Sequence, residues 1–321
     1  MNYGPIYDLL RDKVIDLSVE EVLIGRTWTL CRAENSSGLA MNIAESRRNL
    51  PWSGTLKGKS LSKLADWIVS WDPFEASVAL SAINTSINYN SNLSSQSILL
   101  NPTNRSNLSV FEYFLPRLIN KKIVVVGRYP GLEYYEKILN ITVLEQNPSN
   151  NDLPSMACEY VIQDADWVFL TATSIMNKTF SRVAELAKDT NLVLMGPSVP
   201  WLPELSDFGV DFIAGVDVVD HELLRQVVAE GGGVRIFDEA VNYRVLDLGQ
   251  KEMEWHHVAI SDLVSRRESL KAEMESWYSL SGKGRFPKQS ELIDIDKDLS
   301  SFDTQYKRLW DARHVPNEYL Q

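Results

Sequence analysis

The feature of this sequence that most constrains its fold is an alternation, beginning near residue 120, between short apolar stretches and amphipathic stretches. The apolar stretches have the length of strands, and the intervening stretches place apolar residues at helical spacing. We expect strands at 123–126, 141–144, 167–171, 192–195, 212–216 and 241–246, and helices at 129–139, 177–187 and 220–229. Strands that alternate with helices predict a parallel, doubly wound α/β sheet.

The first ninety residues have a different order of elements. Residues 5–17 have helical spacing, and residues 19–34 alternate as a strand. The cluster Asn35-Ser36-Ser37-Gly38 predicts a turn, after which residues 39–44 pair back as the second arm of a hairpin. Two helices are expected at 61–70 and 73–89, the second with Pro73 in its first turn. This order predicts a small α+β domain over residues 1–90.

Two further segments complete the predicted organisation. A Ser/Asn-rich stretch within residues 91–115 has the composition of a linker and leads into the α/β domain at 116–250. Residues 251–321 carry two patterns of apolar residues at helical spacing, separated by the basic turn 282–287, and predict a helical hairpin. Such a hairpin packs on its own chain or on a partner, either a second copy or another protein.

The charge balance narrows the range of partners. The 321 residues include 43 acidic and 32 basic side chains, for a net charge of −11, which argues against nucleic acid and anionic membrane surfaces. The apolar runs are far shorter than the roughly 20 residues that span a bilayer. Cys31 and Cys158 lie far apart without CxxC spacing, so we expect neither a disulfide framework nor structural zinc. The N-terminal acidic residues do not resemble a secretory leader, and we expect a cytoplasmic protein.

The segment IVVVGRYPGL, residues 123–132, predicts a strand followed by a glycine loop and a helix start. This arrangement presents backbone N–H groups to an anion. Gly127 and Gly131 have the spacing GxxxG, however, and not the GxGxxG of a dinucleotide site. Glu145 ends the next strand, where a carboxylate can accept hydrogen bonds from ribose hydroxyls. The alternative is two structural glycines and a solvated acid.

Polar side chains also follow the next two predicted strands. Thr171, Thr173 and Asn177 come after the strand WVFLT, and Gly196-Pro197-Ser198 ends the strand after that. In open α/β sheets, ligands bind at the carboxyl ends of the strands. Helix capping accounts for one or two of these groups, and we therefore expect a ligand crevice formed by the loops 127–131, 171–179 and 196–200.

In the first domain, Glu75 begins a helix that carries Asn84 and Asn88 on one face, four residues apart. Polar residues in an otherwise small and apolar run suggest contact with the second domain. Glu75 alternatively favours the helix N-terminus through its charge alone. Motifs that would identify a reaction are missing, namely HExxH, the G-x-S-x-G elbow and the P-loop. Whether the protein is an enzyme therefore stays open.

Several blocks in order give the chain a resemblance to a known family. The blocks are SWDPFEASVALSAIN, VVVGRYPGL, LEQNP with NDLP, DADWVFLTATSIMNKT, MGPSVPWLPEL and FGVDFIAGVDV. Together they resemble the family of "putative heavy-metal chelation" domain proteins over roughly residues 5–247. The resemblance implies an enolase N-terminal-like α+β domain, a Rossmann-like domain and a ligand site in the cleft between them. It does not cover the helical extension at 251–321.

The resemblance also implies a set of ligand-binding positions. These are Glu75, Asn84, Gly127, Arg128, Pro130, Gly131, Glu145, Asn147, Thr171, Thr173, Asn177, Gly196, Pro197 and Ser198. The sequence departs from the family pattern at Ala172, where a glycine is usual.

These observations favour binding of a small anionic or metal-bearing ligand in the cleft. Loop N–H groups and Arg128 would hold negative charge, Glu145 would hold hydroxyls or a metal, and Glu75 would contribute a carboxylate from the opposite wall. Oxygen ligands suit hard cations better than soft heavy metals, so a heavy metal is expected inside a chelate. One rival is a transferase with a nucleoside-containing cofactor that places its ribose on Glu145. Another is an assembly factor that acts through residues 251–321.

Overall fold

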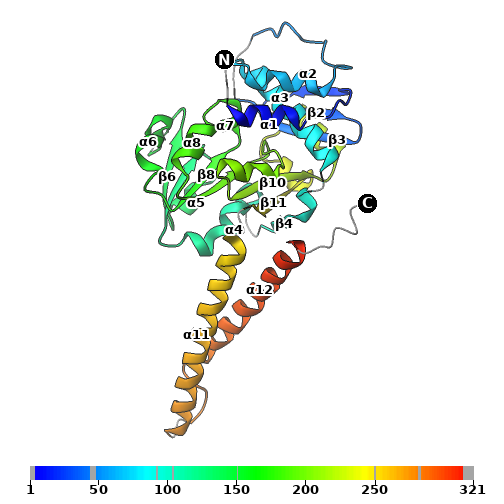
Figure 1. The fold of residues 1–321 in the computed structure, drawn as a ribbon. Coiled ribbons are helices and arrows are strands. Elements are labelled where there is room, and N and C mark those ends of the chain that lie inside the picture. Colours follow the sequence, from blue (N-terminus) through cyan, green and yellow to red (C-terminus); the bar gives the residue numbers. More distant parts are fainter. Residues whose placement is uncertain are drawn as a thin grey trace. The chain divides into compact units, whose positions relative to one another are not determined.

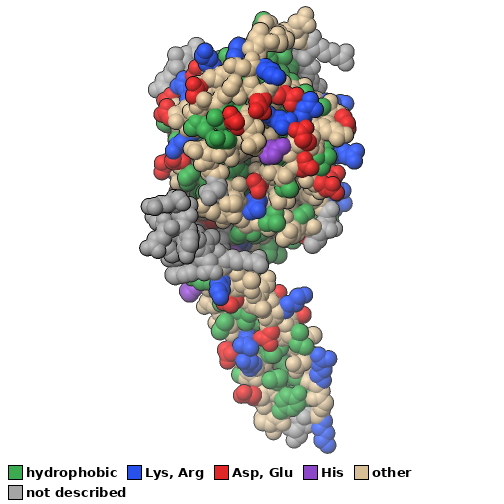
Figure 2. Space-filling model, turned by 90° about the vertical axis from the view of Figure 1, so that its right-hand side faces the viewer, with side chains coloured by type: hydrophobic (Ala, Val, Ile, Leu, Met, Phe, Trp, Pro, Cys, Tyr) green, Lys and Arg blue, Asp and Glu red, His purple; other side chains and the backbone are tan. Residues whose placement is uncertain are grey.

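The computed structural model describes residues 4–43, 48–91, 93–102, 105–149, 151–248, 251–280 and 283–313. Its contacts group into two compact units, Met1–Leu248 and Gly249–Gln321. Among the described residues, no helix is long and apolar enough to cross a membrane. On the face seen in Figure 2, acidic and basic side chains are interspersed over the larger unit, without a broad basic area.

The first unit opens with a three-stranded antiparallel sheet covered by helices (Figure 1). Its elements are α1 (Pro5–Asp12), β1 (Glu21–Ile24), β2 (Trp28–Ala33), β3 (Ser36–Met41), α2 (Leu61–Ala65), the 3₁₀ turn Asp66–Val69 and α3 (Pro73–Asn90). The strand predicted at 19–34 is wrong in its extent, because the chain turns between Ile24 and Trp28 and forms the hairpin of β1 and β2. A meander therefore replaces the predicted single hairpin.

The predicted turn at residues 35–38 is also shifted. The chain reverses at Glu34 and Asn35, and Ser36 to Gly38 already pair with β2. A Cβ atom on Gly38 would lie 2.2 Å from the backbone nitrogen of Thr85 and 2.3 Å from the carbonyl oxygen of Ser81. Gly38 is thus required because β3 approaches the backbone of α3 closely. In the sequence alone, this glycine looks like a turn residue.

α3 confirms its predicted start and length. The side chain of Asp72 caps the helix by accepting a hydrogen bond from the backbone N–H of Phe74 at 2.9 Å, and Pro73 occupies the first turn. Most of its residues from Ala76 to Ile87 are small or apolar and buried. Because these side chains are small, the three-stranded sheet can approach α3 from one side, and the loops of the larger sheet can approach it from the other.

The rest of the first unit is built on an eight-stranded sheet of order β4-β11-β10-β9-β8-β5-β6-β7. The strands are β4 (Ile98–Leu99), β5 (Lys122–Val126), β6 (Asn140–Glu145), β7 (Leu153–Pro154), β8 (Trp167–Thr171), β9 (Asn191–Met195), β10 (Phe212–Val218) and β11 (Val241–Asp247). The six neighbouring strands β10, β9, β8, β5, β6 and β7 are parallel, as predicted. Strand β11 is antiparallel to both β10 and β4. The connection from β10 returns to the end of the sheet that it left, since Val218 pairs with Val241.

The helices around this sheet are mostly short. They are α4 (Ser109–Leu118), α5 (Glu133–Glu136), α6 (Cys158–Val161), α7 (Thr173–Met176), α8 (Phe180–Leu186), α9 (His221–Ala229) and α10 (Ile236–Glu239), with 3₁₀ turns at Leu93–Gln96, Ser106–Leu108, Ser155–Ala157 and Pro203–Phe208. The predicted linker at 91–115 thus contains β4 and most of α4. The helix predicted at 129–139 is reduced to one turn because the chain first forms the loop at 127–132. The helix predicted at 177–187 begins only at Phe180, since Lys178 has a φ of 66°.

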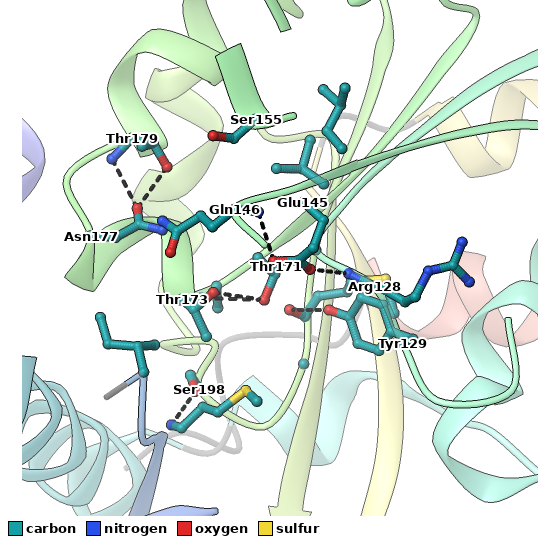
Figure 3. Close-up of a pocket in the computed structure, with 18 of the residues that line it drawn as sticks. Arg128, Tyr129, Glu145, Gln146, Ser155, Thr171, Thr173, Asn177, Thr179 and Ser198 are labelled. Atoms are coloured by element: carbon teal, nitrogen blue, oxygen red, sulfur yellow. Dashed lines mark hydrogen bonds between the residues drawn. The ribbon is translucent and has the colours of Figure 1, made fainter. Parts of the chain in front are cut away.

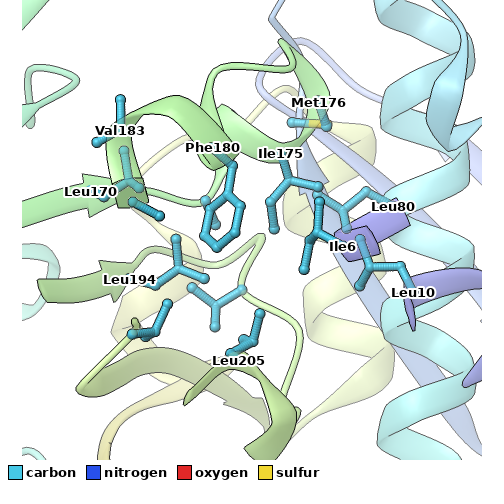
Figure 4. Close-up of a cluster of buried hydrophobic side chains, with 14 of the residues drawn as sticks. Ile6, Leu10, Leu80, Leu170, Ile175, Met176, Phe180, Val183, Leu194 and Leu205 are labelled. Carbon is cyan, nitrogen blue, oxygen red and sulfur yellow. The ribbon is translucent and has the colours of Figure 1, made fainter. Parts of the chain in front are cut away.

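Two hydrophobic clusters cover the two faces of the large sheet. On one face, α1 and α3 of the leading part pack against side chains of β8, β9, α7 and α8, as Figure 4 shows for Ile6, Leu80, Leu170, Phe180 and Leu194. The other face carries an aromatic group centred on α4 and the neighbouring strands. The leading part and the large sheet therefore share one continuous core.

The chain order in the sheet fixes a topological switch point. From β5 the chain moves outward through β6 to β7, and it then returns to β8, which pairs with the other side of β5. The loops that follow β5 and β8 consequently diverge to opposite faces. In open α/β sheets a ligand crevice forms at such a point, beyond the carboxyl ends of the strands.

The second unit is a helical hairpin of α11 (Lys251–Ser279) and α12 (Gln289–Arg313), as predicted. Its buried core consists of Leu270, Leu292 and Ile295, with Leu263 and Leu299 partly buried beside them. Ion pairs join the two helices, including one between Arg267 and Asp296 at 2.7 Å. Ser281 and Gly282, at the start of the predicted basic turn, lie outside the described residues.

Candidate ligand site

A cavity of about 960 Å³ lies at the switch point, beyond the carboxyl ends of β5, β6, β8 and β9. The ends of β2 and β3 and the loop before α10 complete its wall. Its lining includes eleven of the positions predicted from sequence, which are Gly127, Arg128, Pro130, Glu145, Asn147, Thr171, Thr173, Asn177, Gly196, Pro197 and Ser198. Apolar side chains that the sequence analysis did not select, such as Trp28 and Phe237, form much of the remaining wall.

The glycines of the β5 loop permit close packing. Gly127 has a φ of 93°, and a Cβ atom there would lie 2.9 Å from Cγ2 of Thr171 on the neighbouring strand. Gly131 has a φ of 90°, and its Cβ would lie 2.0 Å from a guanidinium nitrogen of Arg105. Both positions therefore favour glycine because of their positive φ, and at Gly127 the neighbouring Thr171 adds a steric reason. Gly131 itself is not among the cavity-lining residues.

Glu145 lies at the end of β6 with both of its carboxylate oxygens hydrogen-bonded to backbone. The backbone N–H of Arg128 donates to one oxygen at 2.8 Å, and that of Gln146 donates to the other at 2.7 Å. Figure 3 shows the carboxylate between the β5 loop and Thr171. The backbone of Arg128, in the β5 loop, and that of Gln146 therefore hold Glu145 in one orientation. Both Glu145 and the β5 loop were predicted to contact the ligand.

Arg128 does not extend its charge toward the cavity. Its guanidinium donates to both oxygens of Asp152 at 2.9 Å and to Glu136 at 2.8 Å, and it points away from Glu145 in Figure 3. These hydrogen bonds raise the pKa of Arg128 and lower the pKa of Asp152. In this structure, two carboxylates neutralise the charge with which Arg128 was expected to hold an anionic ligand. Sequence analysis missed both partners, although Asp152 lies in the NDLP block.

The hydroxyl groups after β8 form a connected polar wall. Thr171 and Thr173 share a hydrogen bond between their hydroxyls at 3.1 Å. The side-chain oxygen of Asn177 accepts hydrogen bonds from the backbone N–H and the hydroxyl of Thr179, at 3.1 and 2.7 Å. Ala172, at the position where the family has glycine, is 1% exposed. The amide nitrogen of Asn177 and the threonine hydroxyls stay near the cavity as hydrogen-bonding groups.

Tyr129 contributes a second wall that the sequence analysis did not assign. Its hydroxyl donates to the carbonyl oxygen of Met195 at 3.2 Å, and burial raises its pKa well above the usual value. A Cβ atom on Gly196, whose φ is 112°, would lie 3.4 Å from that hydroxyl. Tyr129 therefore lies against the turn after β9 as a neutral phenol.

Two predicted ligand residues in the leading part serve structural contacts. Asn84 is 3% exposed, and its amide nitrogen donates to the carbonyl oxygens of Leu39 at 2.8 Å and Ser198 at 3.1 Å. Its side-chain oxygen has no hydrogen-bond partner among the described residues. Glu75 accepts a hydrogen bond from the hydroxyl of Ser70. Neither Glu75 nor Asn84 lines the cavity.

Most of the charged side chains in the cavity wall are paired with opposite charges among the described residues, but Glu145 is not. Arg128 is bound to its two carboxylates, and Glu159 forms an ion pair with Arg182, whose Nε lies 2.8 Å away. Burial is the main cause of a raised pKa at Cys158, which favours the thiol over the thiolate. Glu145 thus contributes a carboxylate held by neutral backbone groups. In the described part of the chain, no group of three or more His, Cys, Asp or Glu side chains is arranged to hold a metal ion.

Comparisons with known proteins identify the relatives of this chain. A 28% identical relative is an uncharacterized protein of Methanocaldococcus jannaschii, matched over 226 residues that cover 66% of this chain and 83% of the relative. A crystal structure of a DUF364 family protein of unknown function from Desulfitobacterium hafniense has 28% identity and a TM-score of 0.66, over 75% of this chain and 96% of that one. A DUF364 protein from Pyrococcus horikoshii, at 20% identity, shares the fold with a TM-score of 0.63, over 77% of this chain and all of that one.

Two family models also match, and both carry the description "Putative heavy-metal chelation". One, DUF4213, matches residues 7–87, and the other, DUF364, matches residues 109–247. The two matches follow each other along the first compact unit and leave the helical hairpin outside. With both models matched in order and DUF364 proteins among the structural neighbours, the resemblance to putative heavy-metal chelation proteins is confirmed over residues 7–87 and 109–247.

Proposed function

We propose that this protein binds one small organic molecule in the cavity at the switch point, and that any metal enters as part of that molecule. The observation that carries this proposal is Glu145, whose carboxylate is fixed by two backbone N–H groups beside the loops after β5 and β8. A preorganised acceptor at the carboxyl edge of an α/β sheet is typical of a ligand site.

The composition of the wall argues for an organic ligand that carries no net negative charge. Trp28, Val126, Met195 and Phe237 offer apolar surface, and hydroxyl and amide groups provide polar contacts. An anion would meet Glu145 without a cation to offset the repulsion, since the guanidinium of Arg128 is bound to Asp152 and Glu136. The anionic ligand expected from the sequence is therefore replaced in our proposal by a neutral or cationic one.

A bare heavy-metal ion fits this wall poorly. Soft metals prefer thiolate and thioether ligands, whereas Glu145 and the threonines offer oxygen. Cys158 and the thioethers of Met41, Met156 and Met195 also line the cavity, but no group of three or more His, Cys, Asp or Glu side chains among the described residues is arranged to hold a metal ion. A metal held by its own organic chelator needs only surface complementarity and a few hydrogen bonds. Such a chelate reconciles the family description with the residues present.

The proposal is tested by native mass spectrometry and metal analysis of the full chain purified without chelators. Gly233 lines the cavity, and a Cβ atom there meets only Thr27, at 3.5 Å or more. We expect a small molecule to accompany the wild type and Gly233→Ala, and to be lost in Gly233→Phe, which fills space. A ligand retained equally by Gly233→Phe would contradict binding in this cavity, as would ligand-free wild type that binds no member of a metabolite library.

Calorimetry with nickel, cobalt and zinc chlorides tests the statement about metals. We expect dissociation constants weaker than about 10 μM for each bare ion, because no group of three or more His, Cys, Asp or Glu side chains among the described residues is arranged to hold one. Stoichiometric binding tighter than about 1 μM, abolished by Glu145→Gln, would show that the protein itself supplies the chelating groups.

A transferase that uses a nucleoside-containing cofactor is the second candidate. Glu145 ends the strand beside β5 and follows Gly127 by 18 residues, the placement in which a carboxylate holds ribose hydroxyls. Copurification of an adenosine-containing compound would favour this candidate. An assembly role for the hairpin, residues 251–321, is the third, and partner binding or oligomeric state that is unchanged after truncation at residue 250 would exclude it.

A further inference from the structure

The β5 loop occupies the position of a phosphate-binding loop, but two of its backbone donors are already engaged within the protein. The backbone N–H of Gly127 donates to the carbonyl oxygen of Leu144 at 2.8 Å, and that of Arg128 donates to Glu145. Pro130 has no N–H group. A phosphate needs several N–H groups that point at it from one loop. Here the Glu145 carboxylate takes the place that a phosphate oxygen would need at Arg128.

Side chains close the same loop to anions. The carboxylate of Asp152, whose side chain is fully buried, and that of Glu136 bind the guanidinium of Arg128. Arg128 is thereby held away from the cavity by a two-carboxylate clamp. A phosphate that bound the backbone N–H of Arg128 would have to displace Glu145, and one that bound its guanidinium would have to compete with this clamp.

We infer that the ligand contacts Glu145 through a pair of neighbouring hydroxyl groups and carries no phosphate at the β5 loop. This inference rests on the proposed binding function and names the class of ligand. Each carboxylate oxygen has two acceptor positions. The N–H groups of Arg128 and Gln146 occupy one position on each oxygen, which leaves one acceptor on each for a pair of donors side by side.

A diol matches the surroundings better than a guanidinium or amidinium group. Such cations only donate hydrogen bonds, whereas a hydroxyl also accepts them. Thr171, Thr173 and Asn177 line the same cavity and supply donors as well as acceptors. A vicinal diol donates to Glu145 and accepts from these groups. The ligand class is therefore a phosphate-free sugar or nucleoside, which can also carry a metal-binding group elsewhere.

Matched pairs of compounds test this inference on the full chain by calorimetry. The probes are the four ribonucleosides and methyl riboside, their 5′-monophosphates, their 2′-deoxy forms, and agmatine as a guanidinium. We expect at least one riboside to bind at least about tenfold more tightly than both its phosphate and its 2′-deoxy form, because each of those changes costs a charge repulsion or a charge-assisted hydrogen bond. Equal or tighter binding of the phosphate, binding of agmatine alone, or no riboside binding would overturn the inference.

Variants at Glu145 provide a second readout that does not require the natural ligand. Glu145→Ala frees the N–H groups of Arg128 and Gln146, and we expect its affinity for inorganic phosphate to exceed that of the wild type by about tenfold. Glu145→Gln, which keeps the size of the side chain, should weaken riboside binding by about tenfold and guards against misfolding of the alanine variant. Glu133→Gln is the matched control, because Glu133 is exposed on α5 and outside the cavity. Wild-type binding of phosphate as tight as that of Glu145→Ala would contradict a closed loop.

The two proposals fail in different ways. If a copurified molecule without a hydroxyl pair is lost in Gly233→Phe, the cavity binds a ligand as proposed but the diol inference is wrong. If ribosides bind equally to the wild type and to Gly233→Phe, the cavity itself is not the site.

Discussion

The two compact units differ in how they are held together. The first has two large hydrophobic clusters on opposite faces of its sheet, in which the strands and helices share buried aliphatic and aromatic side chains. In the described part of the hairpin, the buried cluster consists of Leu270, Leu292 and Ile295, and several ion pairs face solvent. Because buried apolar area is the main source of stability, the two units should respond very differently to comparable substitutions.

The two units also differ in whether they contain the candidate ligand site. The cavity and all of its lining residues belong to the first unit, in which a rigid sheet fixes the loops. The hairpin has a charged exterior and a narrow apolar seam, as in helical pairs that are stabilised along their length. A site that needs fixed donors and acceptors is thus built on the unit with the extensive core.

The largest effect is expected for Phe114→Ala in α4. The ring of Phe114 is fully buried and contacts Trp167, Phe169 and Phe212, with ring centroids 5.2, 5.8 and 5.1 Å away. Its removal leaves a cavity among rings that cannot easily collapse, and we expect a loss of about 3–5 kcal/mol in unfolding free energy. Urea denaturation followed by tryptophan fluorescence measures it. A loss below about 1 kcal/mol would show that the aromatic cluster is not close-packed.

A smaller and local effect is expected for Leu270→Ala in the hairpin. Leu270 is 4% exposed and packs in the three-residue core of the second unit. We expect a loss of about 2 kcal/mol, at the low end for such a change, because the two helices can close part of the gap. Hydrogen exchange should show faster exchange in α11 and α12 and unchanged protection in β8 and β9. Faster exchange in the strands would mean that the two units unfold together.

A pair of charge substitutions sharpens the comparison further. Asp152→Asn removes the carboxylate that binds Arg128, whereas Glu291→Gln removes one partner of the exposed Arg266 in the hairpin. We expect losses of about 1–2 kcal/mol for the first and below about 0.5 kcal/mol for the second, since exposed pairs contribute little. Thermal denaturation of both variants at neutral pH measures the difference, and equal losses would contradict it.

The pH dependence of the Asp152 variant follows from the lowered pKa of this residue. The stabilisation is complete above the unfolded-state pKa of about 3.9 and is lost as the pH falls through the lower pKa of the folded state. The wild type and Asp152→Asn should therefore differ at neutral pH and converge as the pH falls through the lowered pKa of Asp152 in the folded state. A difference that persists at low pH would assign the effect to packing.

The sequence predicted the parts of the site that depend on local order along the chain. A strand, a glycine loop and a carboxylate at the end of the next strand place Gly127 and Glu145 at one edge of the sheet because parallel strands end there together. The charge state of the loop was not predictable in this way. Arg128 is bound by Asp152 and Glu136, and nothing in their spacing indicates that they share one guanidinium.

Other differences between the predicted and the observed structure arise where contacts between distant parts of the chain decide the outcome. Gly38 has the sequence context of a turn, yet its role is contact with the backbone of α3, far along the chain. The direction of β11 likewise depends on where α9 and α10 return the chain, which helical spacing alone does not indicate. The resemblance implied that Glu75 and Asn84 belong to the ligand site, but neither residue lines the cavity.

The hydrogen bonds around Ser198 have a consequence for how a ligand enters and leaves. The backbone N–H of Met41 donates to the hydroxyl of Ser198 at 2.8 Å, and Asn84 joins the carbonyls of Leu39 and Ser198. The β3 side of the cavity is therefore fastened to the loop after β9 and cannot open without breaking buried hydrogen bonds. Met156 and Val234, 80% and 47% exposed, line the cavity in the 3₁₀ turn Ser155–Ala157 and in the loop before α10. We therefore expect a ligand to enter and leave past these two exposed side chains rather than across the β3 side of the cavity.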